Sequence, residues 1–414
     1  MQRRTFMKFL VAGSAGVALA WYWPDEGVIN PCYAGVTPRT LLDNELLSAA
    51  WQDINPQLYR DVHTHLIGNG DSQSGIYVNP KMQDIFSPAA YLRYKFYINA
   101  SCAGSQQGID KGYVLHLRQL LSDFPAGAKC MLLAFDYHYD QNGKRDLPRT
   151  PFYTPNTYAH EVAQASPQRF DWMASIHPYR EDCVEALDKA VANGARGVKW
   201  LPPVMGIDPS SAKCDRFYAA MVRHQIPLLS HGGNEHAVHD VDAQAKGNPL
   251  LLRRALDHGV RVIVAHCACD GSGVDLDKGP NAGRVDNFKL FSRLLAEPRY
   301  ENNLFGDISA MTQLNHLGSA LQTVIVRDDW HHRLVNGSDY PLPGVMPLFS
   351  VKTMHAQGYL KKSKLAFLSE LRRHNPLLFD FVLKRHLRWQ GKAFSAVVFE
   401  SQRVFNNIKM MRAI

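Results

Sequence analysis

The sequence predicts an α/β fold: a (β/α)₈ TIM barrel that follows an N-terminal signal and lead-in segment and ends in C-terminal helices. From about residue 59 onward, short apolar runs alternate with amphipathic stretches of helical period, which indicates βα units around a parallel sheet. Eight such runs within about 280 residues fit one closed barrel. No G-x-G-x-x-G fingerprint follows any run, which counts against a dinucleotide-binding open sheet.

The eight predicted strands share a short apolar core. In chain order they are Tyr59–Leu66, Cys130–Phe135, Phe170–Ile176, Gly197–Leu201, Ile226–Ser230, Arg261–Ala265, Leu304–Ile308 and Arg333–Asn336. Amphipathic helices are expected between them at Cys183–Asn193, Asp215–His224, Pro249–His258 and Val285–Glu297. Because segment 67–128 is too long for a plain connection, we expect two helices and a loop over the barrel mouth there. Helices near 364–373 and 376–387 are expected to finish the chain.

The first residues have the parts of an export signal. Arg3 and Arg4 precede an uncharged run, residues 9–24, which contains an A-x-A cleavage site at residues 18–20. The arginine pair resembles a twin-arginine signal, so we expect the twin-arginine export machinery as a partner and the periplasm as the location. The alternative is an uncleaved signal that anchors the chain in the membrane, although the run is short for the roughly 20 residues of a spanning helix.

The expected organisation is one barrel domain with additions. Residues 1–20 form the export signal, 21–58 a lead-in arm, 59–345 the barrel, and 346–414 a C-terminal helical extension of the same domain. The formal net charge is +8, but basic and acidic residues are well mixed, so no nucleic-acid partner is expected. The seven cysteines do not indicate a disulfide framework, and whether a single bridge forms stays open, as does a homo-oligomer.

The strongest local signal is the run Asp61-Val62-His63-Thr64-His65. Side chains alternate along a strand, so the two histidines project to the same side, into the barrel. An H-x-H pattern is weak by itself, because a histidine pair is often a surface or core feature. Its weight comes from the later strands, several of which also end in ionisable residues.

Four later strand ends carry such residues: Lys199, His231, His266 and Asp339. In a barrel the carboxyl ends of all strands open on one mouth, where the site lies. Neutral imidazole and carboxylate are the ligands that Zn²⁺ or a similar divalent ion prefers. The sequence therefore predicts a metal site that keeps a position open for water or substrate.

In this order and spacing, Asp-x-His-x-His, Gly-Val-Lys, Ser-His-Gly, Ala-His-Cys and Gly-Ser-Asp-Tyr-Pro resemble the amidohydrolase superfamily. Within it they resemble the amidohydrolase-related branch, which includes the aminocarboxymuconate-semialdehyde decarboxylase-like enzymes. The resemblance covers residues 59–345 and implies one divalent metal per chain, expected to be Zn²⁺, held by His63, His65, His231 and Asp339. It implies also that His266 polarises the substrate or helps activate water, and that Asp339 carries the proton.

Three positions allow alternative readings. Lys199 stands where binuclear relatives carry a carboxylated lysine that bridges two metals. The single-metal branch favours instead a Lys199 that points away from the ion and binds a substrate carboxylate or pairs with a nearby acid. His138 and His177 also end strands, and each either contacts the substrate or is a packed, hydrogen-bonded histidine.

The resemblance implies a metal-dependent hydrolase that acts on a small-molecule amide, ester or lactone through metal-activated water. The first alternative is a lyase of the same scaffold, a metal-dependent decarboxylase. The second is an exported metal-binding protein without catalysis. The fold does not choose between them. Export favours hydrolysis, because the intermediates of catabolic decarboxylation are usually handled inside the cell.

Overall fold

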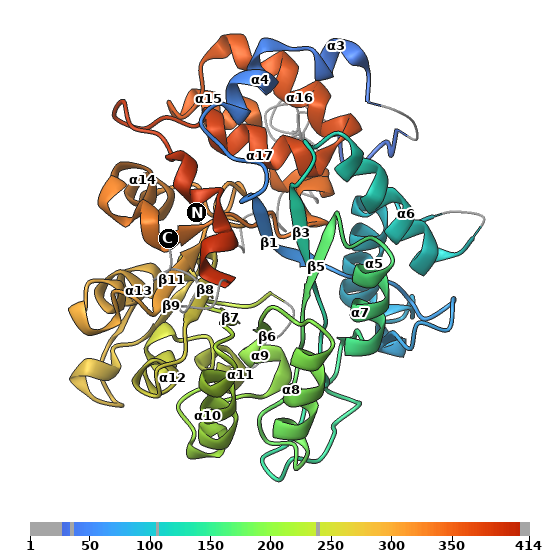
Figure 1. The fold of residues 1–414 in the computed structure, drawn as a ribbon. Helices are drawn as coiled ribbons and strands as arrows, with labels where there is room; N and C mark the ends of the chain where they lie inside the picture. The colour runs from blue at the N-terminus through green and yellow to red at the C-terminus, as the bar shows by residue number, and fades with distance from the viewer. Residues whose placement is uncertain (1–26, 34–36, 105–106, 237–240, 406–414) are drawn as a thin grey trace, which may run out of the picture.

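The structure, a computed structural model, describes residues 27–33, 37–104, 107–236 and 241–405; the predicted export signal lies outside them. Eight parallel strands alternate with helices along the chain (Figure 1). These strands are β1 (Arg60–His65), β3 (Lys129–Leu133), β5 (Phe170–Met173), β6 (Val198–Trp200), β7 (Leu228–His231), β8 (Val262–Ala265), β11 (Leu304–Asp307) and β12 (Leu334–Val335). All eight predicted strands are therefore present, with ends that differ by at most three residues.

Hydrogen bonds close the strands into a barrel. Two parallel ladders run β1-β3-β5 and β6-β7-β8-β11-β12. Ala174, just past β5, bridges Val198 of β6, and Thr64 of β1 bridges Tyr340, beyond β12. The strand order is therefore β1-β3-β5-β6-β7-β8-β11-β12 and back to β1, which confirms the predicted TIM-barrel fold.

Alternation of side chains along the strands fills the barrel. In β3, Met131 and Leu133 belong to the interior cluster, whereas Cys130 and Leu132 belong to the layer packed against the helices. Phe405, at the end of η12 (Ser401–Phe405), joins the interior cluster as well. Apolar side chains therefore fill the barrel interior, and the ionisable strand-end residues are left at the carboxyl ends of the strands.

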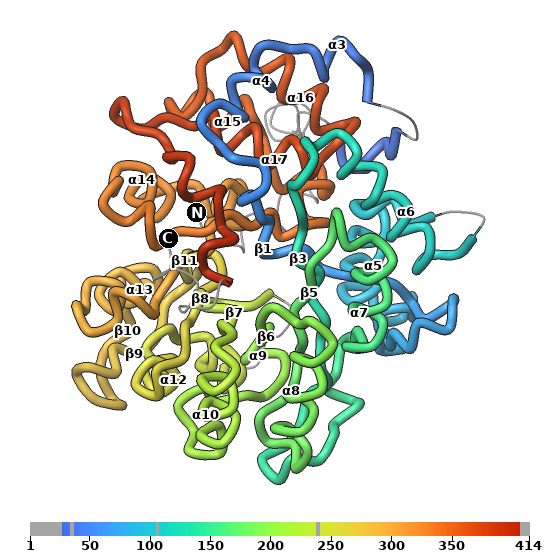
Figure 2. The backbone as a smooth tube through the Cα atoms, in the orientation of Figure 1, coloured from blue at the N-terminus to red at the C-terminus, as the bar shows by residue number. Residues whose placement is uncertain are grey.

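Helices surround the strands (Figures 1 and 2). They include α7 (Asn156–Gln164), α8 (Cys183–Ala192), α9 (Pro202–Met205), α10 (Asp215–His224), α12 (Arg253–Asp257), α13 (Asn287–Leu295) and α14 (Ser319–Val326). The predicted helix 249–258 is divided into a 3₁₀ turn, η3 (Pro249–Leu252), and α12. The predicted helix 285–297 begins later than expected, because its first residues form β10 (Arg284–Asp286), which pairs with β9 (Ser272–Val274).

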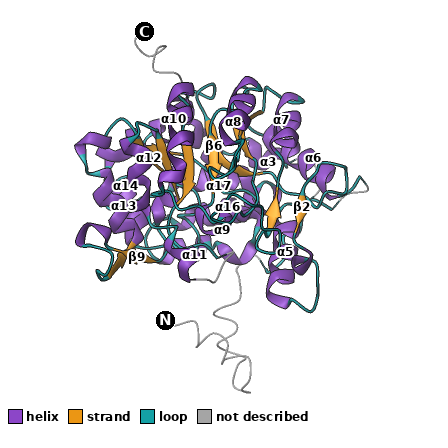
Figure 3. Ribbon diagram, turned by 90° about the horizontal axis from the view of Figure 1, so that it is seen from below, coloured by secondary structure: helices purple, strands orange, loops and turns teal. Residues whose placement is uncertain are grey.

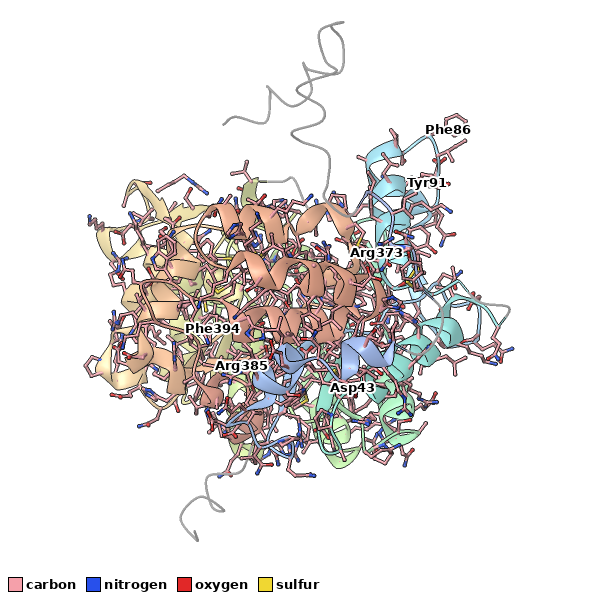
Figure 4. All side chains as sticks on the ribbon, turned by 90° about the horizontal axis from the view of Figure 1, so that it is seen from above. Asp43, Phe86, Tyr91, Arg373, Arg385 and Phe394 are labelled. Carbon is pink, nitrogen blue, oxygen red and sulfur yellow. A yellow bond between two sulfur atoms is a disulfide. The ribbon has the colours of Figure 1, made fainter. Side chains whose placement is uncertain are left out.

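The lead-in arm packs against the C-terminal helices. It contains α3 (Arg39–Leu42) and α4 (Glu45–Trp51), which lie beside α15 (Val351–Ala356), α16 (Leu365–His374) and α17 (Pro376–His386) in Figures 1 and 4. The ring centroids of Trp51 and Phe381 are 4.3 Å apart. Arg385, labelled in Figure 4, donates hydrogen bonds to the carbonyl oxygens of Ala50 and Phe394. The helices predicted near 364–373 and 376–387 are thus confirmed.

The long segment 67–128 contains the two predicted helices, α5 (Pro88–Ala100) and α6 (Ile109–Ser122). It also contains η1 (Pro80–Met82) and β2 (Tyr77–Val78), which pairs with β4 (Phe152–Tyr153). Figure 3 shows β2 beside α5. A disulfide joins Cys32 of the lead-in arm to Cys102, two residues past α5, so the question that the cysteine count leaves open is answered by one bridge.

A membrane-spanning helix would need a long apolar stretch. Within the described ranges, no helix is both long and apolar enough to cross a membrane.

Candidate active site

One cavity of about 150 Å³ collects most of the predicted site residues. Its polar part comes from the carboxyl ends of five strands and comprises His63, His65, Lys199, His231, His266 and Asp339. In a parallel barrel these strand ends meet at one mouth, which is why residues more than 270 positions apart in the sequence lie together.

His63, His65 and Asp339 form the tightest group in the cavity. Their ligand atoms all lie within 4.8 Å of one another. Nε2 of His65 is 3.0 Å and Nε2 of His63 is 3.4 Å from the same oxygen of Asp339, Oδ1. Two imidazoles and a carboxylate therefore face a common point, as the H-x-H pattern and the Gly-Ser-Asp motif predict.

A buried carboxylate that the sequence reasoning missed fixes the ring of His63. Nδ1 of His63 donates to Oδ2 of Asp307 at 2.7 Å, and the hydroxyl of Ser309 donates to the same oxygen at 2.7 Å. Asp307 is fully buried at the end of β11. Because its proton is on Nδ1, a neutral His63 presents the lone pair of Nε2 to the cavity. The sequence signal that could have identified Asp307 is a single carboxylate at the end of an apolar strand.

Lys199 points into the cavity. Its Nζ lies 3.0 Å from Nε2 of His63, and the side chain is 1% exposed. Burial lowers the pKa of this ammonium to about 8, although the charges of Asp339 and Asp307 favour the protonated form. The structure therefore differs from the expectation that Lys199 turns away from the ligands.

His231 and His266 line the same cavity as His63. The ring centroid of His266 lies 5.1 Å from that of His63 and 5.3 Å from that of His231. Nε2 of His231 donates to the carbonyl oxygen of Asn234 at 3.2 Å. His231 thus shares the cavity with His63, His65 and Asp339 but stands apart from their tight group.

His266 and Asp339 both have strained backbones. Each adopts φ = 58°, in the left-handed region that residues with a Cβ rarely occupy. Such a conformation costs on the order of 1–3 kcal/mol and persists where the surroundings impose it. Strain of this kind clusters at functional sites, and here it affects two of the residues to which the sequence assigns chemistry.

Asp61, the first residue of the Asp-x-His-x-His motif, supports the site from behind. Its Oδ1 accepts hydrogen bonds from the backbone of His63 at 3.1 Å and of Ser338 at 2.9 Å. Gly337 allows this approach, because a Cβ at that position would lie 2.7 Å from the Cβ of His63. The Gly-Ser-Asp motif is therefore needed to bring Asp339 close to β1.

The charge states suit a divalent cation. Burial lowers the pKa of His63 and His231 to about 3 and that of His266 to about 4, so all three are neutral at pH 7. Burial alone would raise the pKa of Asp339, but His63 and His266 outweigh it and hold the pKa well below the usual range. Neutral imidazoles with an ionised carboxylate are the protonation states that metal binding requires, so the donor set fits the expected ion.

Two other predicted histidines do not line the cavity. Nε2 of His177 donates to the carbonyl oxygen of Met205 at 3.0 Å, and its Nδ1 accepts a hydrogen bond from the backbone of Tyr179 at 3.2 Å. Nδ1 of His138 lies 2.8 Å from the carbonyl oxygen of Val204. His177 therefore has the packed, hydrogen-bonded role, and the substrate-contact alternative is not supported by its position.

The outer wall of the cavity is mostly apolar and comes from segment 67–128 and β4. It comprises Ile67, Ile76, Val78, Met82, Tyr94, Tyr97, Ile98 and Phe152. Glu235, beyond β7, adds one carboxylate. The sequence predicts a loop over the mouth but not these residues, because their role depends on how distant segments meet.

Asp307→Asn should weaken metal binding in the cavity about 10- to 100-fold, the usual effect of changing the partner of a ligating histidine. Asparagine keeps the size of the side chain but removes the charge that holds the proton on Nδ1 of His63. Titration of the metal-free variant with Zn²⁺ measures the effect. Asp136→Asn is the control, because Asp136 is also buried but lies outside the cavity, where it accepts a hydrogen bond from the backbone of His177. Equal affinity in the Asp307 variant and the wild type would contradict the role assigned to Asp307.

Several solved structures are similar to this chain. The putative 2-pyrone-4,6-dicarboxylic acid hydrolase of Pseudomonas putida is 14% identical over 84% of this chain and 97% of that one, with a TM-score of 0.43. The 5-carboxyvanillate decarboxylase of Sphingomonas paucimobilis is 9% identical over 84% and 98%, with a TM-score of 0.45. An uncharacterised TIM-barrel protein of Bordetella bronchiseptica is 13% identical over 77% and 95%, with a TM-score of 0.43. These similarities are too distant to indicate a reaction.

The search of curated proteins found no match for this sequence. Residues 131–346, more than half of the 414 residues, match the family described as amidohydrolase. The match runs from β3 past Asp339 and so includes Lys199, His231 and His266. The chain belongs to the amidohydrolase family.

Proposed function

We propose that the chain is a metal-dependent hydrolase that cleaves an amide, ester or lactone with water. The observation that carries this proposal is the meeting of His65, neutral His63, ionised Asp339 and neutral His266 in one largely apolar cavity. A carboxylate and a bare imidazole nitrogen beside a set of metal ligands are what water activation requires.

One divalent ion would be held by His63, His65, His231 and Asp339, with Zn²⁺ the first candidate because imidazole and carboxylate suit it. When bound, the ion supplies Lewis-acid chemistry and lowers the pKa of water. For His231 to join the other three, its ring has to leave the carbonyl oxygen of Asn234.

Asp339 is the group that we assign to proton transfer. Ionised at pH 7, it accepts a proton from the attacking water and delivers it to the leaving nitrogen or oxygen. Oδ2 of Asp339 lies 3.9 Å from Nε2 of His266, so the two groups face the same region of the cavity. A water molecule between Asp339 and His266 would therefore contact both groups.

The tautomer of His266 favours one of its two expected roles. Its Nδ1 lies 3.1 Å from the carbonyl oxygen of Ser309, which can only accept, so Nδ1 carries the proton. A neutral His266 therefore presents a bare Nε2 to the cavity. Such a nitrogen accepts a hydrogen bond from water, and we assign it to water activation instead of to donation toward the substrate oxygen.

The wall of the cavity indicates the rest of the substrate. Lys199 is the one lysine or arginine among the described residues that line the cavity, and we assign it to an anionic or carbonyl oxygen of the substrate. The wall beyond it is formed mainly by Ile76, Met82, Ile98 and Phe152. The part of the substrate that does not react is therefore proposed to be apolar, with no carboxylate beyond any that binds Lys199.

A metal-dependent decarboxylase is the second candidate, and Lys199 favours it, because an ammonium at the base of the cavity suits a substrate carboxylate. Screening metal-analysed protein against lactone, amide, ester and carboxylic-acid panels separates the two. Incorporation of ¹⁸O from labelled water into the product supports the hydrolase, whereas release of CO₂ supports the lyase. Bound metal without turnover in any panel would favour a metal-binding protein without catalysis.

His266→Asn should lower kcat about 100-fold and leave the metal content near one equivalent. The reason is that asparagine fills part of the same space but offers no basic nitrogen at the position of Nε2. Metal analysis beside steady-state kinetics provides the check. If the variant loses metal as His63→Ala is expected to do, His266 is a ligand and the assignment to water activation is wrong.

Export through the twin-arginine route and a periplasmic location are also proposed. The Cys32–Cys102 bridge supports this, because disulfides persist in oxidising compartments. A route that carries folded proteins suits a chain whose metal binding is coupled to folding.

Replacing Arg3 and Arg4 together with lysine should keep the protein in the cytoplasm with its signal uncleaved. Cell fractionation and the mass of the purified chain measure the outcome. Normal processing and periplasmic recovery of the double variant would show that another route is used.

A further inference from the structure

A second group of potential metal ligands lies outside the cavity. His236, Asp270 and His316 follow β7, β8 and β11, three neighbouring strands, and their ligand atoms all lie within 4.8 Å of one another. Nε2 of His236 is 2.9 Å from Oδ2 of Asp270. None of the three lines the cavity that holds His63.

The orientation of His316 is the independent sign of a ligand. Its Nδ1 lies 2.9 Å from the carbonyl oxygen of Ala310, so the proton of the neutral ring is on Nδ1 and the lone pair is on Nε2. That Nε2 atom is buried and has no hydrogen-bond partner in the protein. A buried acceptor without a partner is unfavourable and calls for an explanation.

We propose that His236, Asp270 and His316 form a second divalent-metal site, separate from the cavity. Two imidazoles and one carboxylate suit Zn²⁺ and leave a fourth position for water. Histidines that bind a metal usually donate the N–H of their other ring nitrogen to a carbonyl or carboxylate, and the carbonyl of Ala310 accepts from His316 in this way. A simple ion pair between His236 and Asp270 would leave the buried Nε2 of His316 without a function, whereas a metal ion satisfies it.

Such an ion would connect three loops at the barrel mouth. The loops after β7 and β8 already touch, because the backbone of Asn234 donates to the carbonyl oxygen of Asp270 at 3.0 Å. A ligand from His316 adds the loop after β11. Glu235, the neighbour of His236, lines the cavity, so the ion would hold this part of the cavity wall in place.

Zinc titration of untagged, metal-free protein tests the proposal. We expect His316→Ala and His316→Gln each to bind one equivalent of Zn²⁺ fewer than the wild type after desalting. His355→Ala is the matched control: the ring of His355 is equally half-buried and its Nδ1 lies 2.7 Å from the carbonyl oxygen of Leu360, but it has no second ligand beside it. This control should bind as much Zn²⁺ as the wild type.

The His63→Ala background separates this site from the one in the cavity. There, the remaining equivalent of Zn²⁺ should raise Tm, and adding His316→Gln should remove both the binding and the rise in Tm. Equal zinc content in His316→Gln and the wild type, or a rise in Tm that survives the double substitution, would overturn the proposal. Because this background lacks one cavity ligand, His63, and the readout does not depend on turnover, either outcome leaves the proposed hydrolase function unaffected.

Discussion

Replacing His63 with alanine should release the metal from the cavity and lower kcat by more than about 100-fold. This is a larger effect than is usual when a residue that only hydrogen-bonds to a metal ligand is changed. His63 offers the lone pair of Nε2, and Asp307 and Ser309 contact the other ring nitrogen, Nδ1, and hold the ring in place. The barrel should stay folded, because eight strands and the apolar interior do not depend on one imidazole. Metal analysis, kinetics and thermal unfolding followed by circular dichroism measure the three parts.

His138→Ala is the control for that variant. His138 also follows a barrel strand, but it does not line the cavity. It should keep both metal and turnover. Full activity of His63→Ala after chelation would rule out the central role of the metal, and loss of the folded state would call for the gentler variant His63→Gln.

Asp339→Asn should lower kcat about 10²- to 10⁴-fold, the range expected when a general base is removed. The change keeps the size of the side chain and its contacts with His65 but removes the charge and the ability to accept a proton. Weaker metal binding is expected as well, because Asp339 is the only anion in the proposed ligand set. Kinetics at saturating Zn²⁺ separates the two effects.

Recovery of full turnover of Asp339→Asn at saturating Zn²⁺ would mean that Asp339 serves the metal alone. In that case the proton transfer has to be assigned to His266. A second carboxylate, that of Glu235, lines the cavity too, and Glu235→Gln in the same assay shows whether it takes part.

The barrel could be predicted from the sequence because its signals are local. Apolar runs such as Val262–Ala265 form strands, and each strand places its last polar residue at the mouth. The small ladders β2–β4 and β9–β10 were not predicted, because each joins short segments whose pairing depends on the finished fold. The 3₁₀ turn at Pro249–Leu252 likewise reflects a proline start that an amphipathic pattern does not reveal.

The candidate site shows the same division. His63, His65 and Asp339 meet as predicted, because strand alternation and barrel closure dictate their directions. Asp307 was missed, since its partner His63 is 244 positions away and only the fold brings them together. His177 shows the converse: a strand-end position indicates function, but the hydrogen bonds that make it structural come from other loops.

The floor and the wall of the cavity come from different parts of the chain. Strand ends supply the ionisable floor, whereas α5 supplies Tyr94, Tyr97 and Ile98 of the wall. Ala100 is the only fully buried residue of α5, so most of that helix lies outside the core of the barrel. Substitutions in α5 can therefore change which molecules enter without disturbing the residues that react. If the proposed function holds, a library of substitutions at Tyr94, Tyr97 and Ile98 should change substrate range while the proposed metal ligands stay in place.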